Sequence, residues 1–525
     1  MLPRSHRQGV LHMKPIRLMS GFFTVGVWTL LSRVLGFARE VLLLSLIGPG
    51  PVMDAFVAAF RLPNMFRRFF AEGAFNAAFV PMFAKRLEAG EGAGIFARDA
   101  FNGLALVVTL LTGIGMVFMP VLVWLTAEGF VGNARFDMTV GYGRIAFPYI
   151  LCMSLSALFS GILNATGRFA VAAAAPVLLN IFVITAMIIG AVTGGAVIDW
   201  LIWSIPLAGV AQLALTWRAA AAAGFPLRFS RPHWTPDMKA MITVALPAAL
   251  ASGVMQINLV VGQLVASQYD SAVSWLFAAD RLYQLPLGVV GIAVGVVLLP
   301  DLARRLRAND EDGAHYTLSR AAEISLALTI PSAVALMVIP GSLVRVLFER
   351  GASDMDDTAA IATAVMIYGL GLPAFVLQKI LQPLYFARED TRRPFYFALV
   401  AMVINAGLAF GLAPFVGWIA PAIATTFAGW AMFACLAIGV RRYGVAARFD
   451  RRFHKRIWRI IAASVVMGIA LWVGNAVLQP FLGLPWWRGL ALLVLIALGA
   501  ASYFGTGQKI GAFRLSEFKG ALRRG

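Results

Sequence analysis

Hydrophobic stretches of about 20 residues or more recur from one end of the chain to the other, separated by short polar and basic segments. A stretch of this length predicts a membrane-spanning helix. No polar segment of domain size interrupts the series. The pattern therefore predicts an all-α polytopic membrane protein of about fourteen transmembrane helices, at residues 20–48, 52–86, 100–127, 138–164, 172–194, 198–220, 240–268, 272–303, 318–340, 357–387, 395–415, 418–440, 457–479 and 488–506.

Basic residues are distributed unevenly among the predicted loops. When residues 1–19 are placed in the cytoplasm, about 32 of the 44 Lys and Arg residues fall in cytoplasmic loops and tails. About four fall outside, at Arg135, Arg345, Arg350 and Arg488. Because basic loops stay in the cytoplasm, the asymmetry predicts that both termini are cytoplasmic. An odd number of spans would move one end outside and weaken this bias.

Composition excludes several classes of protein. The chain is 60% hydrophobic and 13% charged, with a net charge of +19. The positive-inside rule accounts for this charge, so no nucleic-acid partner is expected. Two cysteines in apolar segments provide neither a disulfide framework nor a metal site. All five histidines fall in predicted cytoplasmic segments, and we therefore expect no enzyme, no bound metal and no cofactor.

The two halves of the chain resemble each other. RLPNMFRRFFAEGAFNAAFVPMFAKRL, from Arg61, and RLYQLPLGVVGIAVGVVLLPDLARRL, from Arg281, both open with Arg-Leu and place a proline five residues before a second Arg-Leu. Corresponding segments are six spans apart, so they cross the membrane in the same direction. This predicts two parallel six-helix bundles around a central cavity. The expected divisions are a tail (1–19), an N-terminal bundle (20–222), a linker (223–239), a C-terminal bundle (240–440), a basic loop (441–456), and two extra helices with a tail (457–525).

Charged residues occur inside the predicted spans, where each one is costly. The first span contains SRVLGFARE, with Arg33 and Arg39 about 120° apart around a helix and therefore able to share one broad face. The second and eighth spans add further charges. The full set is Arg33, Arg39, Arg61, Arg67, Arg68 and Arg281, with the carboxylates Glu40, Asp54, Glu72 and Asp280.

Arginine is in excess in this set. Intramembrane charges usually face a bundle interior or a water-filled cavity, and arginine forks bind phosphate oxygens in a two-point manner. The set therefore predicts a net-positive cavity for a phosphate-bearing substrate. Asp54 lies seven residues before Arg61, which lies seven before Arg68, so we expect these three on one face of the second span. The alternative interpretation is that the charges only pair with one another and lock helices together.

Three sequence stretches carry a family resemblance: SRVLGFARE, DAFVAAFRLPNMFRRFFAEGAFNAAFVP and AVSWLFAADRL. They resemble the MurJ (MviN) family of lipid II flippases, within the multidrug/oligosaccharidyl-lipid/polysaccharide exporter superfamily. The resemblance implies that the protein moves undecaprenyl-pyrophosphate-linked disaccharide-pentapeptide across the bacterial cytoplasmic (inner) membrane for peptidoglycan synthesis. Family residues important for this map onto Arg33, Arg39, Asp54, Arg67, Arg68, Asp280 and Arg281, with a basic residue also at the position of Arg61. Asp54 and Asp280 are then expected as gate pairs, and Glu40 and Glu72 as gating or ion-pair residues.

The resemblance also concerns the two extra helices and the source of energy. In the family these helices are thought to form a groove for the lipid tail, although packing helices would have the same composition. Some relatives hold a sodium ion in the C-terminal half, for which the candidates here are Asn258, Asn405 and Thr425. Carboxylates are not evident beside these three residues. We therefore expect coupling to the membrane potential or to another monovalent cation.

Other functions are left open by the residues. A flippase for a different polyprenyl-pyrophosphate glycan would need a similar cavity, whereas a multidrug exporter of the same superfamily would need an acidic or aromatic one. A scaffold that recruits cell-wall synthases would use the basic segment 441–459 as a docking patch. Anchoring of this segment to anionic lipid is the favoured interpretation.

Overall fold

The computed structural model describes residues 18–67, 74–231, 233–293 and 298–513, and the regular structure in these residues is helical. Helices are expected because a chain in lipid has to satisfy its backbone polar groups within each segment. The helices are α1 (Leu18–Leu46), α2 (Pro51–Arg67), α3 (Ala74–Ala89), α4 (Ala93–Val117), α5 (Met119–Thr126), η2 (Glu128–Phe130), α6 (Ala134–Ala146), α7 (Tyr149–Ala165), α8 (Phe169–Thr193), α9 (Val197–Ala222), α10 (Pro236–Ser267), α11 (Ala272–Ala293), α12 (Leu299–Arg307), α13 (Glu311–Val338), α14 (Pro340–Phe348), α15 (Met355–Phe386), α16 (Arg392–Val416), η4 (Gly417–Ile419), α17 (Ala420–Gly439), η5 (Val440–Ala447), α18 (Arg451–Leu482) and α19 (Arg488–Lys509).

Prolines divide two of the predicted helices. The segment 100–127 is interrupted at Phe118, just before Pro120, and 138–164 is interrupted at Phe147 and Pro148. The predicted end of 318–340 agrees with the break between α13 and α14, which begins at Pro340. Proline lacks an amide hydrogen and clashes with the preceding turn, so it readily begins a new helix. Nine stretches of the described chain are long and apolar enough to span a membrane, and α1, α2 and α11, which carry intramembrane charges, are not among them. The count of fourteen spans stays a prediction.

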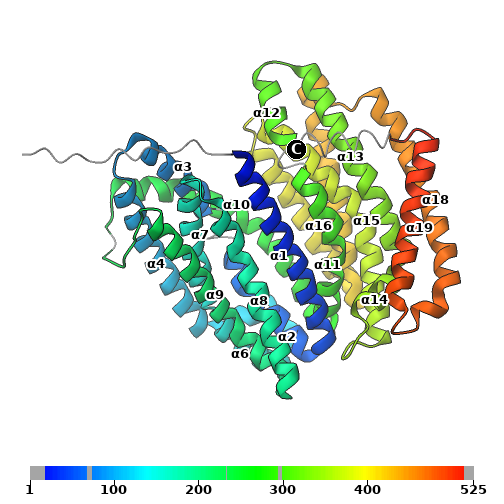
Figure 1. Ribbon diagram of the computed structural model, residues 1–525, viewed down its shortest axis with the longest axis horizontal. Coiled ribbons are helices and arrows are strands. Elements are labelled where there is room, and N and C mark those ends of the chain that lie inside the picture. The colour runs from blue at the N-terminus through cyan, green and yellow to red at the C-terminus, as the bar shows by residue number, and fades with distance from the viewer. Residues whose placement is uncertain (1–17, 68–73, 232, 294–297, 514–525) are drawn as a thin grey trace, which may run out of the picture.

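The helices form two lobes that lie close together at one end. Figure 1 shows α2 to α9 on the left, α11 to α19 on the right, and α1 between them. The two lobes diverge towards the end at which α1 begins. At the opposite end a single hydrophobic core joins them, containing Leu44 and Met53 from the first half of the chain and Val273 and Phe348 from the second.

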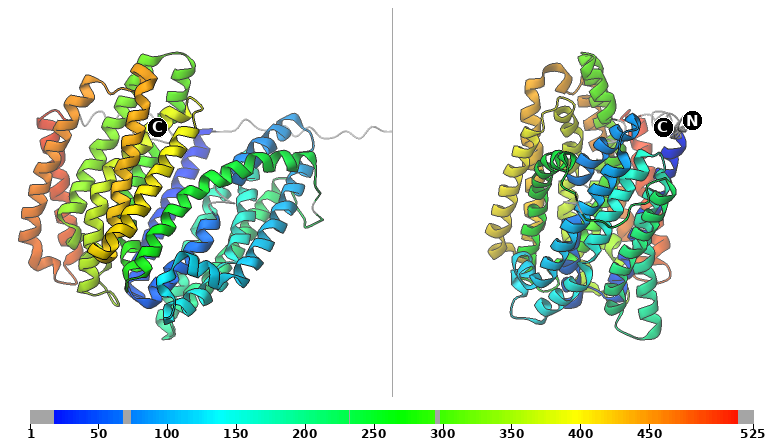
Figure 2. Two further views of the ribbon diagram at one scale, coloured as in Figure 1. Left: turned by 180° about the vertical axis from the view of Figure 1, so that it is seen from behind. Right: turned by 90° about the vertical axis from the view of Figure 1, so that its left-hand side faces the viewer.

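Helix α10 belongs to both lobes. Its first turns place Met238 and Met241 in the core of the N-terminal lobe, whereas its last turns place Val261 and Val265 against Ala409 on α16. The left panel of Figure 2 shows α10 as one long curved helix that crosses from one lobe to the other. This helix therefore connects the two lobes on one side of the space between them.

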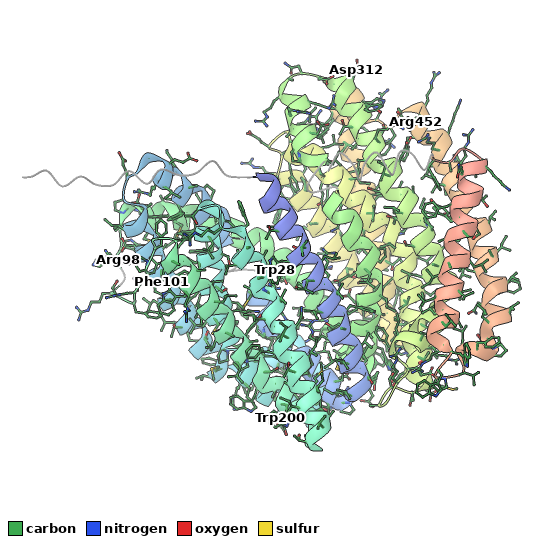
Figure 3. The ribbon with its side chains drawn as sticks, in the orientation of Figure 1. Trp28, Arg98, Phe101, Trp200, Asp312 and Arg452 are labelled. Carbon is green, nitrogen blue, oxygen red and sulfur yellow. The ribbon has the colours of Figure 1, made fainter. Side chains whose placement is uncertain are left out.

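Helices α18 and α19 pack on the outside of the C-terminal lobe, beside α13 (Figure 1). The Tyr503 hydroxyl donates a hydrogen bond to the Ala327 carbonyl at 2.5 Å, and Met467 and Leu495 share a buried core with Ala327. Figure 3 shows Asp312 and Arg452 at the end where α1 begins and Trp200 at the opposite end.

Candidate functional site

A cavity of about 420 Å³ lies between the lobes and is lined by seven helices, α1, α2 and α7 to α11. Six charged side chains line it, and all were expected at the site from the sequence: Arg39, Arg61, Arg67, Arg281, Glu40 and Asp280. The structure therefore brings six of the ten predicted site residues together around one cavity.

Arg39 is held by two partners. Its Nη2 donates to Glu40 Oε1 at 2.6 Å, and its Nη1 donates to Asn180 Oδ1 at 3.0 Å. The amide of Asn180 donates in turn to the Ser32 carbonyl at 2.9 Å, so α8 fixes the orientation of this guanidinium group. Gly36 faces Asn180, and a Cβ added there would lie 3.7 Å from the Asn180 Nδ2, an ordinary contact distance.

Glu40 is the shared counter-ion of two cavity arginines. Its side chain is only 5% exposed, and its Oε1 lies 2.6 Å from Arg39 Nη2 and 3.7 Å from Arg281 Nε. Arg281 also lies over the ring of Phe277, at 4.5 Å from the centroid. A buried carboxylate needs such partners because an isolated buried charge is strongly unfavourable.

Two further charged residues approach the cavity from opposite lobes. Arg61 on α2 donates to the Leu259 carbonyl on α10 at 3.4 Å, and Asp280 on α11 accepts from the Gln284 amide. Arg61 and Arg281 occupy matching positions in the sequence repeat, and both line the cavity. With four arginines against two carboxylates, the described lining has an excess of positive charge suited to phosphate oxygens.

Four other predicted site residues, Arg33, Asp54, Arg68 and Glu72, are not on the described cavity wall. Arg33 packs against α11, where a Cβ added to Gly288 would lie 2.2 Å from Arg33 Nη1. It is also within electrostatic reach of Lys379 on α15. Arg68 and Glu72 lie outside the described residues.

Asp54 does not line the described cavity, although it was expected on the same helix face as Arg61. It is fully buried at the end of the molecule where the lobes meet, with its Oδ1 accepting hydrogen bonds from the Ser274 amide at 2.8 Å and the Ser274 hydroxyl at 2.7 Å. Seven residues return a helix to the same face but advance it by about 10 Å along the axis. Asp54 and Arg61 can therefore share a helix face and still lie at different positions along the helix axis.

Arg135, which was predicted only as an external loop residue, lies in the first turn of α6. The structure buries it between the lobes, 3.5 Å from Asp54 Oδ2 and 3.1 Å from Asp270 Oδ1. It also donates to the Tyr269 carbonyl at 3.2 Å and lies over the ring of Phe130. Arg135 is one of only about four basic residues in the predicted external loops, and this rarity was the sequence feature that could have singled it out.

The candidate sodium ligands form a hydrogen-bonded amide pair. Asn405 Nδ2 donates to Asn258 Oδ1 at 2.7 Å, while Thr425 lies on the neighbouring helix α17. The buried Asn405 Oδ1 has no hydrogen-bond partner, but these donors include no carboxylate to balance a cation. No cluster of three or more His, Cys, Asp or Glu residues occurs in the described part of the chain. The residues present therefore do not fit a sodium ion.

The two lobes, the long apolar helices and the charged cavity define a polytopic membrane protein of the transporter type. A family model for lipid II flippase MurJ matches residues 43–488. This chain belongs to that family.

Similar proteins agree with this assignment. Probable lipid II flippases MurJ from Rhizobium tropici and Rhizobium meliloti are 42% and 44% identical to the chain, each covering 97% of both sequences. The lipid II flippase MurJ of Burkholderia cenocepacia is 31% identical, covering 93% of this chain and 97% of its own.

Solved structures share the fold. A lipid II flippase MurJ in an inward closed conformation superposes with a TM-score of 0.77 at 24% identity, covering 92% of this chain and 98% of its own. An inward-facing MATE-family multidrug transporter of the MOP superfamily gives 0.67 at 16% identity, covering 79% and 95%. At these identities the structural likeness establishes the fold alone.

Proposed function

We propose that this protein is a lipid II flippase, which moves the polyprenyl-pyrophosphate-linked peptidoglycan precursor from the inner to the outer leaflet of the bacterial cytoplasmic membrane. The observation that carries the proposal is the cationic cavity between the two lobes, built from Arg39, Arg61, Arg67 and Arg281. Membership of the lipid II flippase MurJ family supports the choice of substrate.

The cavity chemistry suits a diphosphate linked to a polar head group. Guanidinium groups offer paired donors that match phosphate oxygens. The electrostatic attraction between the two groups becomes stronger where little water is present. Glu40 shares its carboxylate between Arg39 and Arg281, so an arriving diphosphate competes with Glu40 for the same donors. The polyprenyl tail stays in the lipid while the head group occupies the cavity, as the high cost of burying polar groups in hydrocarbon requires.

Contacts at one end of the molecule support transport by alternating access. Besides the Asp54–Ser274 bonds, the Gly129 amide donates to the Ser267 hydroxyl at 3.0 Å, and the Ala352 amide donates to the Ser45 carbonyl at 2.9 Å. We place this closed end outside and both termini in the cytoplasm, following the distribution of basic residues.

Opening of the outer end requires the Asp54 contacts to separate, which makes Asp54 a gate residue. Asp280 lies on the same helix as Ser274, within the cavity, and is the second proposed gate residue. Ligand binding drives closure only if the head group binds one state more tightly than the other. Movement of the cavity charges is coupled to the membrane potential at about 2.3 kcal/mol per charge per 100 mV, and this potential is our proposed energy source.

The test measures lipid II in the outer leaflet of bacteria that depend on this protein as their only flippase. Wild type is compared with Arg39→Ala, and with Arg144→Ala as a matched control. Arg144 is an exposed arginine outside the described cavity lining, bonded to the Met116 carbonyl at 3.2 Å. Equal membrane abundance of the three proteins is verified first.

We expect wild type and Arg144→Ala to expose labelled lipid II, and Arg39→Ala to leave it in the inner leaflet. If wild type also fails to expose lipid II, the substrate assignment is wrong, and another polyprenyl-pyrophosphate glycan becomes the leading candidate. If Arg39→Ala exposes lipid II as well as wild type does, Arg39 is dispensable and the cationic cavity does not carry transport.

Interactions with cell-wall synthases would use the basic segment 441–459, but part of this segment packs against its own chain. Arg452 Nε and Arg456 Nη1 lie 3.6 and 3.3 Å from Glu323 Oε2 on α13, and Arg320 pairs with Asp450. Attachment of α18 to the C-terminal lobe is therefore the function we propose for these two arginines.

A further inference from the structure

Neutral polar side chains line the cavity together with the charged ones. In the described lining the arginines and carboxylates lie on α1, α2 and α11, whereas Tyr149 on α7, Gln212 on α9 and Gln256 on α10 line the cavity from other helices. The diphosphate chemistry of the arginines does not explain these neutral side chains.

Gln212 is nearly fully buried, with 1% of its surface exposed, and still lines the cavity. Its Oε1 accepts a hydrogen bond from the Tyr149 hydroxyl at 3.4 Å, and its Nε2 has no hydrogen-bond partner. Reversing the amide would let the hydroxyl accept from the nitrogen and leave the oxygen without a partner instead. In either orientation one polar atom of this amide has no hydrogen-bond partner among the described residues.

Close packing of α7 against α9 fixes this amide in place. A Cβ added to Gly209, one turn before Gln212, would lie 2.8 Å from Tyr149 Cδ2, so only glycine permits this approach. One turn after Gln212, the Thr216 hydroxyl donates to the Ser156 hydroxyl at 3.1 Å. The Gln212 side chain is thus positioned from both sides, which lowers the entropic cost of binding a ligand.

A buried amide without a partner destabilises a folded protein, and such a group is commonly found where a ligand supplies the missing bond. An amide and a phenol bind uncharged oxygen and nitrogen atoms, such as those of an acetamido group, a sugar hydroxyl or a peptide amide. Neither of them compensates a phosphate charge as an arginine does.

We infer that Gln212 and Tyr149 form a subsite that hydrogen-bonds an uncharged amide or hydroxyl group of the transported head group, and that this subsite distinguishes a glycosylated polyprenyl diphosphate from the bare diphosphate lipid. The inference rests on the proposed function. It adds a selective contact to the cavity arginines, which bind both lipids alike.

The test compares the affinities of the purified full-length protein for lipid II and for undecaprenyl diphosphate. Gln212→Met keeps the length and flexibility of the side chain and removes its polar groups. We expect it to weaken lipid II binding about ten-fold, which corresponds to about 1.4 kcal/mol, and to leave undecaprenyl diphosphate binding unchanged. Tyr149→Phe is expected to weaken lipid II binding as well, but less than Gln212→Met does. It removes the phenol hydroxyl and leaves the Gln212 amide in place, although less firmly oriented.

Thr216→Val is the matched control. It removes a polar group from the same α7–α9 interface one turn away, outside the described cavity lining, and should leave the ratio of the two affinities unchanged. Thermal unfolding supplies a second readout. Because the Gln212 amide is incompletely bonded, Gln212→Met should retain the thermal midpoint of the wild type; a large fall would instead identify a structural role.

Each outcome decides between the proposals. Equal weakening of both lipids by Gln212→Met, or no weakening of lipid II, overturns the subsite. A wild type that binds both lipids equally overturns the subsite and leaves the cationic cavity in place. A wild type that binds neither lipid overturns the proposed function itself. A disaccharide lipid without its pentapeptide then identifies the contacted group: a persistent ten-fold effect assigns it to the sugars, and its loss assigns it to the peptide.

Discussion

Single charged side chains in this protein are stabilised by partners on other helices. Arg39 contacts Glu40 and Asn180, Asp54 contacts Ser274, and Arg135 joins Asp54 to the opposite lobe. Such pairs are costly to break from one side, because the remaining charge is left buried and uncompensated.

Replacement of Arg135 by glutamine tests this cost. The variant leaves the fully buried Asp54 without its cation, and we expect a loss of about 3 kcal/mol in the free energy of unfolding. Asp270→Asn is the control, because the Asp270 side chain is 89% exposed and its pair with Arg135 should contribute less than about 1 kcal/mol. Unfolding in detergent, followed by tryptophan fluorescence, measures both. Equal losses in the two variants would contradict a buried role for Arg135.

Residue types and helix faces were predictable from sequence, but depth in the membrane was not. The arginines of α1, α2 and α11 were expected in one cavity because charge in lipid needs a polar interior. Asp54 shares a helix face with Arg61 and still lies at the end of the lobes, where Ser274 and Arg135 surround it. Its partners come from α6 and α11, and no local sequence pattern encodes which helices meet there.

Turns and helix ends determine how closely the elements approach. The short link between α1, which ends at Leu46, and α2, which begins at Pro51, is one example. The sequence did not reveal that this link contacts the loop after α14, because only the three-dimensional arrangement brings Ala352 to Gly48. Two helix breaks at prolines, before Pro120 and at Pro148, were likewise missed, since apolar character continues across each of them.

Gly48→Ala is predicted to open the end of the molecule at which the lobes meet. The backbone of Gly48 has φ +72°, and an added Cβ would lie 2.3 Å from the Ala352 carbonyl oxygen. Gly90→Ala is the control, since Gly90 has φ +70° and nothing within 4 Å of the added atom. Spin labels at the exposed positions Val131 and Phe415 should report longer distances for Gly48→Ala alone. An unchanged distance distribution would show that the contact is not needed for closure.

Asp450 is predicted to stabilise the start of α18 without pH dependence near neutrality. Burial tends to raise the pKa of Asp450, but the Phe453 amide and the Arg320 guanidinium outweigh it and hold the pKa below 3.8. The stabilisation is therefore complete above about 3.8 and disappears only as the pH falls through the lower folded-state pKa. Asp450→Ala should cost about 1 kcal/mol through loss of the helix cap.

The measurement for Asp450 is the difference in thermal midpoint between wild type and Asp450→Ala, taken at pH about 8 and about 5.5. We expect the same difference at both values. A difference that shrinks between them would mean that the carboxyl group already takes up a proton in the folded protein, contrary to the predicted direction of its pKa.

The orientation of the whole molecule in the membrane is predicted by the distribution of its basic residues and not by its fold. Basic residues gather at the ends of helices where α1 begins, and this distribution predicts that the α3–α4 loop is cytoplasmic and the α8–α9 loop external. The polytopic all-α class followed from the hydrophobic pattern, whereas the curvature of α10 across both lobes depends on long-range packing by Met238 and Val265.

Single cysteines test the orientation in intact cells. With Cys152 and Cys435 replaced by alanine, an impermeant thiol reagent should label Ala196→Cys in the α8–α9 loop and fail to label Glu91→Cys in the α3–α4 loop. Both positions are exposed in the structure, so access depends on the side of the membrane. Permeabilised cells should label both. The reverse pattern in intact cells would invert the predicted topology.

Glu40, placed between Arg39 and Arg281, has a consequence for the return half of a transport cycle. A carrier has to reset without cargo, and every uncompensated charge moved through the field costs about 2.3 kcal/mol per 100 mV. A built-in carboxylate reduces the net charge of the empty cavity, and the phosphates of the cargo reduce it when the cavity is full. Because Glu40 is present in both the loaded and the unloaded stroke, the two strokes still differ by the charge of the cargo, but each stroke moves less net charge than the number of arginines alone would suggest.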